Sequence, residues 1–149
     1  MPLGDGDENF RRRERGVEYA ALCAWILAAV AGGYLLVIWI LNGGRSTKVT
    51  RFPVLVVVGH PLAAVAGLAV WIAYLVTGNT ACAWAAFIAL LVVALQGFML
   101  FTRWLVGCGG RHARGAEQVF PAAAVAVHGA VAVTTVVLVF LTAIQVTGA

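Results

Sequence analysis

The chain has few charged residues. Asp, Glu, Lys and Arg together make up 11% of its 149 residues, whereas 62% are hydrophobic. A water-soluble domain of this size needs much more polar surface, so the composition excludes that class. The six acidic residues all lie outside the long apolar runs. Their absence from these runs argues against a proton pump, an ion-coupled transporter or a channel.

Cysteine motifs are also scarce. The chain has three cysteines and contains no C-x-x-C or C-x-x-C-H sequence, which excludes a covalently attached c-type haem. Cys23 and Cys82 stand in identical Cys-Ala-Trp triplets near the starts of two apolar runs, where ordinary packing accounts for them. Cys108 and His112 form a C-x3-H pair, which by itself is a poor metal-binding signal.

Four apolar runs are each longer than about 18 residues, the length that indicates a membrane-spanning helix. We expect helices at residues 19–41, 54–76, 81–105 and 122–146. The predicted fold class is therefore an all-α integral membrane protein with four transmembrane helices. No stretch remains for a soluble catalytic domain, so any chemistry lies within the bilayer or belongs to a partner.

The second and fourth runs are copies of one pattern. The segments 52–78 and 120–148 both open with Phe-Pro, close with Thr-Gly and lack Asp, Glu, Lys and Arg. Each follows an apolar run with a Cys-Ala-Trp triplet and then a basic loop, which indicates an internal repeat. We expect a solvated tail at 1–18 and two helical hairpins at 19–78 and 79–149. Parallel repeats of this kind are related by a pseudo-twofold axis along the membrane normal.

Each copy carries one histidine at the same place. His60 follows Phe52 by eight residues, and His128 follows Phe120 by eight. Eight residues of helix span about 12 Å, so both imidazoles lie at one depth and face each other across the axis. Histidines within membrane spans indicate a functional site. Neutral imidazole is a good ligand for haem iron, and helical bundles take such ligands from facing helices.

The other two helices offer glycines at this depth. Gly33 precedes Leu41 by eight residues, and Gly97 precedes Leu105 by eight. Because a porphyrin between helices requires close backbone approach, these glycines favour haem b bound by His60 and His128.

Several polar residues are candidates for contacts with this haem. Arg51, and with it Arg111 or Arg114, lies at the membrane face where arginine pairs with haem propionates. Gln96, Thr134 or Thr135 is a candidate for contact with an imidazole or the macrocycle.

Other roles for the histidines stay open. They could hydrogen-bond to each other, to threonine side chains or to the carbonyl that Pro61 leaves without its helical donor. Small residues around them are also ordinary packing material in membrane bundles. A copper or zinc site, a quinone contact and a proton relay are further alternatives.

The chain resembles small b-type cytochromes, which include cytochrome b561-like proteins and the membrane anchors of respiratory dehydrogenases. The resemblance rests on four helices, on His60 and His128 as the presumed pair of axial ligands, and on Gly33 and Gly97, which leave space for a porphyrin. The resemblance implies an electron-transfer subunit with one non-covalent haem b and no catalytic site of its own. It further implies membership of a larger membrane complex or a homo-oligomer, with quinone as a partner. Because the chain has one candidate ligand pair where many of those families have two, at most one such haem fits.

A second function class is a cofactor-free accessory or assembly subunit of a membrane complex, and a small transporter or channel is a weaker third. The net charge of +4 reflects topology and not nucleic-acid binding. Six Lys and Arg residues in the two basic loops against four in the tail favour both termini outside. Arginine in excess of lysine, with abundant Ala, Val and Gly, favours a bacterial plasma membrane.

Overall fold

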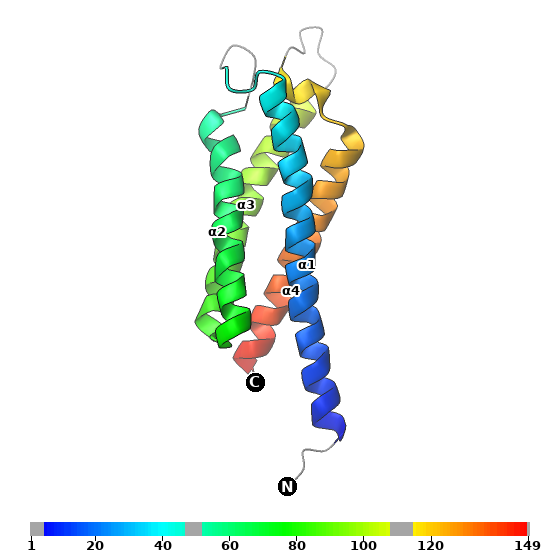
Figure 1. Cartoon of the computed structure of the whole chain (residues 1–149), viewed down its shortest axis with the longest axis vertical. Helices are drawn as coiled ribbons and strands as arrows, with labels where there is room; N and C mark the ends of the chain where they lie inside the picture. The colour runs from blue at the N-terminus through cyan, green and yellow to red at the C-terminus, as the bar shows by residue number, and fades with distance from the viewer. Residues whose placement is uncertain (1–4, 47–51, 108–114, 149) are drawn as a thin grey trace.

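The computed structural model describes residues 5–46, 52–107 and 115–148, with side chains from residue 15 onward. Four long helices form an elongated bundle (Figure 1). They are α1 (Asp5–Leu41), α2 (Val54–Thr77), α3 (Thr80–Gly107) and α4 (Ala122–Gly148), and a short 3-10 helix, η1 (Ala116–Val119), precedes α4. No strand occurs in these residues. The predicted all-α class with four membrane-length helices is confirmed.

Local signals explain where the helices begin and end. α2 starts directly after Pro53 and α4 directly after Pro121, because proline suits a helix start and lacks the N–H that a helix interior needs. α2 ends at Thr77, and the next residue, Gly78, has a φ of 66°, the left-handed conformation that terminates many helices. The side-chain oxygen of Asn79 then accepts the N–H of Ala81 at 2.9 Å and caps the start of α3.

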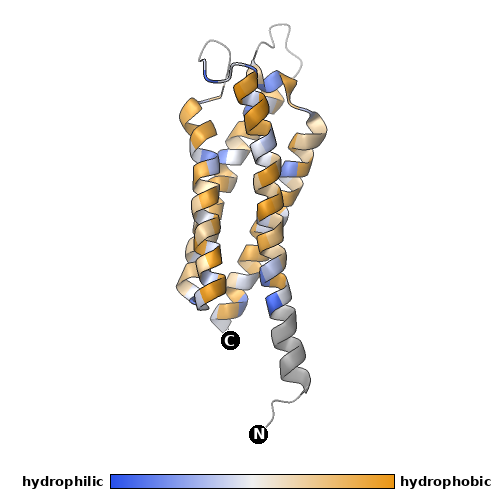
Figure 2. Cartoon of the chain, in the orientation of Figure 1, coloured by the Kyte–Doolittle hydropathy of each residue, from blue (hydrophilic) through white to orange (hydrophobic). Residues whose placement is uncertain are grey.

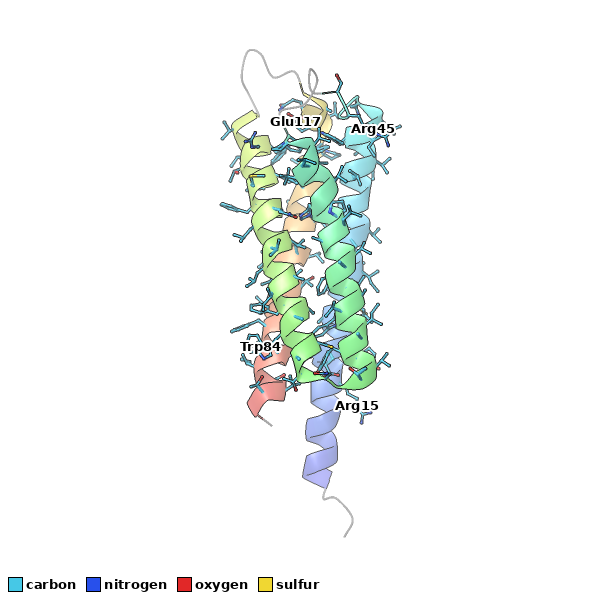
Figure 3. The ribbon with its side chains drawn as sticks, turned by 90° about the vertical axis from the view of Figure 1, so that its left-hand side faces the viewer. Arg15, Arg45, Trp84 and Glu117 are labelled. Atoms are coloured by element: carbon cyan, nitrogen blue, oxygen red, sulfur yellow. The ribbon has the colours of Figure 1, made fainter. Side chains whose placement is uncertain are left out.

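The chain begins and ends at the same end of the bundle (Figure 1). We call this the terminal end, and the opposite end, where α1 joins α2 and α3 joins α4, the loop end. Figure 3 shows Arg15 and Trp84 at the terminal end and Arg45 and Glu117 at the loop end. α1 is helical from Asp5, so it starts before the span predicted at 19–41.

The outer faces of the helices are apolar (Figure 2). Many large apolar side chains point outward, with Leu55 88% exposed and Val76 80% exposed. Four segments are long and apolar enough to cross a membrane, namely Arg15–Leu41, Val54–Thr77, Thr80–Gly107 and Ala122–Gly148. Exposure of so large an apolar surface to water is unfavourable, whereas contact with the hydrocarbon chains of lipids is favourable.

Inside the bundle, α2 packs mainly on α3, and α1 packs mainly on α4. Most of the buried apolar side chains in the described residues belong to one of two clusters. The terminal-end cluster includes Trp25, Trp71, Leu90 and Val139. The loop-end cluster is Trp39, Phe52, Val57 and Ala116.

A hydrogen bond links α1 to α2 at the terminal end of the bundle. The hydroxyl of Tyr74 in α2 donates a hydrogen bond to the carboxylate of Glu18 in α1. Tyr74 is buried and its ring centre lies 5.0 Å from that of Trp71. Glu18 therefore tethers α1 to α2 where the apolar part of α1 begins.

Candidate functional site

The two histidines meet in a layer between the two buried clusters. His60 on α2 lies between Val57 of the loop-end cluster and Trp71 of the terminal-end cluster. His128 on α4 faces it, with the two ring centres 6.2 Å apart and the ring planes at 74°. The structure thus brings together the two residues that the repeat singled out.

His60 is held by the backbone of α3. Its Nδ1 lies 3.1 Å from the carbonyl oxygen of Val93. In a helix that carbonyl also accepts the N–H four residues later, which belongs to Gly97. The imidazole reaches the carbonyl by lying across Gly97, where an added Cβ atom would stand 3.1 Å from Cε1 of His60. Glycine at this position therefore makes room for the ring.

His128 repeats the same arrangement on α1. Its Nδ1 lies 3.0 Å from the carbonyl oxygen of Ala28, which precedes Gly32 by four residues. A Cβ atom added at Gly32 would stand 2.9 Å from Cε1 of His128. Each histidine therefore uses one carbonyl and one glycine of the helix against which its own helix packs.

These hydrogen bonds determine the tautomer. A carbonyl only accepts, so Nδ1 of each ring carries the proton and donates it. In a neutral imidazole Nε2 is then the unprotonated nitrogen with a free lone pair. Neither Nε2 has a hydrogen-bond partner among the described residues. A metal-binding histidine in proteins commonly has this form, with its other nitrogen donating to a carbonyl.

The predicted glycines divide into one that contacts an imidazole and one that does not. Gly97 lies against His60 as described above. A Cβ atom added at Gly33 would meet nothing within 4 Å, and Gly32 lies against His128 instead. A count of residues from the helix end predicts the depth of a glycine but not the direction in which it points. Successive residues of a helix point about 100° apart, and it is Gly32, one residue before Gly33, that points toward the imidazole of His128.

The predicted arginines Arg51, Arg111 and Arg114 lie outside the described residues. The other polar candidates near the histidines differ in whether they form hydrogen bonds. Hydroxyls of Thr134 and Thr135 donate to carbonyls of their own helix, those of Ala130 and Val131. In contrast, Oε1 of Gln96 is buried and has no hydrogen-bond partner among the residues that the structure describes.

The carbonyls of Val93 and Ala28 were not expected from the sequence, because a backbone group leaves no residue-type signature. The sequence does contain a pattern that distinguishes Gly32 from Gly33. Gly32 precedes Trp39 by seven residues, just as Gly97 precedes Trp104 by seven. The Cys-Ala-Trp triplets are a less useful guide, because Trp25 is buried while Trp84 is half-buried and donates to Thr147.

The site therefore offers two imidazoles, one from α2 and one from α4, with ring centres 6.2 Å apart. Within the part of the chain that the structure describes, no three His, Cys, Asp or Glu residues gather as a metal site. No protein-family model, curated protein or solved structure matches this chain.

Proposed function

We propose that the chain is a membrane electron-transfer subunit that holds one haem b between His60 and His128. The observation that carries the proposal is the matched pair of imidazoles, each oriented by a carbonyl and a glycine, with ring centres 6.2 Å apart. Haem b supplies one-electron transfer when it is bound. His60 and His128 would be the two protein ligands that hold it.

The distance fits this role. A metal ion lies about 2.0 to 2.1 Å from an imidazole nitrogen, and that nitrogen lies about 1 Å from the ring centre. Two imidazoles on opposite sides of one metal ion therefore have ring centres roughly 6 Å apart, close to the 6.2 Å observed.

The chain's own groups have distinct tasks in this proposal. The carbonyls of Val93 and Ala28 fix the ring orientation and raise the basicity of Nε2. Gly97 and Gly32 admit the imidazoles close to the helix backbones. Arg51 keeps its proposed role as an ion-pair partner of the propionates at the loop end.

The depth of the site suggests where electrons enter or leave. His60 and His128 each lie six residues after the first residue of their helices, which is about 9 Å from the loop end of the helix, and they lie farther from the terminal end. We therefore place the exchange partner at the loop end. A quinone or another subunit of a larger complex in a bacterial plasma membrane fits this position, with the loops inside the cell and both termini outside.

Replacement of either histidine tests the assignment. We expect His60→Ala and His128→Ala each to abolish stoichiometric haem in detergent-purified protein, as measured by a pyridine haemochrome. His112→Ala is the matched control, because it removes the third histidine and leaves the pair intact. Normal haem content in both site variants would rule out axial ligation by this pair.

A cofactor-free accessory subunit is the second candidate. It is favoured by the fact that ring centres 6.2 Å apart at 74° also suit direct edge-to-face packing of two aromatic rings. Under this function both histidine variants assemble with their parent complex, and the purified chain stays colourless. Loss of haem from the variants, together with haem in the unmodified chain, decides against it.

A further inference from the structure

The indole nitrogen of Trp104 in α3 is a buried donor whose hydrogen is unused in the described part of the chain. Its N–H is enclosed by the bundle and makes no hydrogen bond among the described residues, although buried polar groups normally have partners. An indole N–H donates and cannot accept. A ligand that completes this position must therefore supply a hydrogen-bond acceptor inside the bundle.

Trp104 lies on the loop-end side of the histidine layer. It packs against the loop-end cluster, and it follows Gly97, the glycine that contacts His60, by seven residues. Seven residues are close to two full turns, so Trp104 and Gly97 lie on the same face of α3, about 10.5 Å apart along the helix. Aromatic side chains of a helix lean toward its N-terminus, and α3 begins at the terminal end (Figure 3). The indole of Trp104 therefore leans back toward the histidine layer.

Haem b carries its hydrogen-bond acceptors on one edge. Its methyl and vinyl groups neither donate nor accept hydrogen bonds, so the two propionate carboxylates are the acceptors at its periphery. A propionate carboxylate lies roughly 8 Å from the iron, given a metal–nitrogen bond of about 2 Å and carbon–carbon bonds of about 1.5 Å. A haem held by His60 and His128 with its propionates toward the loop end therefore brings a carboxylate to the depth of the Trp104 indole.

We propose that Trp104 donates a hydrogen bond from its indole N–H to a propionate of haem b, and this inference rests on the proposed function. A hydrogen bond from an N–H group to a carboxylate is charge-assisted and stronger than one between neutral groups. The bond satisfies the buried donor and orients the haem with its propionates toward the loop end. The proposed ion pair between Arg51 and the propionates lies at that same end.

Two other tryptophans differ from Trp104 in position or in contacts. The N–H of Trp71 is also buried without a partner among the described residues, but Trp71 follows His60 by eleven residues, roughly 16 Å toward the terminal end. Trp39 has the place in α1 that Trp104 has in α3, but its ring packs against Gly44 in the turn after α1. Trp104 therefore combines an unused N–H with a position within reach of a propionate.

The contact is tested by titrating the full-length apoprotein in detergent with two porphyrins. One is haem b, and the other is an iron porphyrin that carries ethyl groups in place of the propionates. Trp104→Phe keeps an aromatic ring and removes the N–H, so any change in packing affects both porphyrins alike, while the lost hydrogen bond affects haem b alone. The ratio of the haem b affinity to the ethyl-porphyrin affinity therefore falls by about 10-fold to 150-fold, the range that a hydrogen bond to a charged group supports.

Two further variants make the result specific. Trp71→Phe is the matched control, because it removes a buried indole N–H that lies out of reach of the propionates, and it leaves the ratio unchanged. Benzothienylalanine at position 104 has the shape of tryptophan with sulfur in place of the N–H group. It lowers the ratio as Trp104→Phe does, even if the phenylalanine variant fails to fold.

An unchanged ratio in either variant at position 104 that folds would overturn the role of Trp104 and leave haem binding intact. A ratio that falls in Trp71→Phe and not in Trp104→Phe would place the propionates toward the terminal end and overturn it as well. Failure of the unmodified chain to bind haem b would instead overturn the proposed function itself.

Discussion

At the scale of single residues, the site depends on two glycines whose lack of a side chain leaves space for the histidine rings. An imidazole that donates to a helix carbonyl must lie across the residue four positions later, and there a methyl group would come within 3.1 Å of the ring at Gly97 and 2.9 Å at Gly32. Glycine costs helix stability relative to alanine, so its presence in both helices is explained by the contact. The adjacent residues Gly32 and Gly33 distinguish the loss of helix stability from the contact with the imidazole, because only Gly32 contacts a histidine ring.

We therefore predict opposite outcomes for two adjacent substitutions. Gly32→Ala displaces His128, and overpacking of this size costs about 1 to 3 kcal/mol, so haem affinity falls by about 5-fold to 150-fold. The Cβ atom added by Gly33→Ala has no neighbouring atom within 4 Å, so this variant leaves the haem affinity unchanged. It gains up to about 1 kcal/mol in helix stability. Haem titration of the apoprotein in detergent measures both. Equal affinities for the two variants would contradict the proposed contact.

The hydrogen bond between Tyr74 and Glu18 leads to a second residue-scale prediction. A hydrogen bond to a charged group contributes about 1.5 to 3 kcal/mol, so Tyr74→Phe lowers the thermal midpoint of unfolding in detergent. Tyr34→Phe is the control, because Tyr34 is 52% exposed and packs less tightly. If both variants melt at the same temperature as the unmodified chain, the tether between α1 and α2 does not stabilise the bundle.

At the scale of helices, most boundaries could be predicted because proline, glycine and asparagine act locally. Pro53, Pro121 and Gly78 lie at helix ends for reasons that do not depend on the rest of the fold. The rotation of each helix about its axis could not be predicted in the same way, since it depends on which neighbour each face meets. This is why a residue count predicts a depth but not the direction of each glycine, and Gly32, not Gly33, contacts His128.

The pairing of the two Phe-Pro helix starts can be tested by cross-linking. The rings of Phe52 and Phe120 have centres 6.1 Å apart at the loop end. With the native cysteines replaced by serine, Phe52→Cys and Phe120→Cys together should cross-link readily with a short bifunctional maleimide. Phe52→Cys with Phe140→Cys is the control, because Phe140 contacts Phe87 elsewhere on the bundle. Cross-linking of the control pair alone would contradict the described helix arrangement.

At the scale of the whole molecule, apolar run length and composition were sufficient to predict the bundle. Four segments long enough to cross a membrane appear both in the sequence and in the structure. The histidine pair could also be predicted, because the repeat places His60 and His128 at one depth. The partner carbonyls of Val93 and Ala28 could not, since any residue supplies a carbonyl and only the packed helices select one.

Orientation in the membrane stays a prediction at this scale. The basic loops favour the cytoplasmic side, so a single cysteine at Ser46 should resist an impermeant maleimide in intact cells and react after lysis. A single cysteine at Thr147 should react in both cases, because α1 starts and α4 ends at the opposite end of the bundle (Figure 1). The reverse pattern would place both termini inside the cell.

The most direct test of the haem assignment is a reduced-minus-oxidised absorption spectrum of the purified full-length chain, with a pyridine haemochrome count. The proposed site predicts a sharp α band typical of six-coordinate haem b, at about one haem per chain. A featureless spectrum from protein expressed with added haem would contradict the assignment and leave His60 and His128 with structural hydrogen bonds alone.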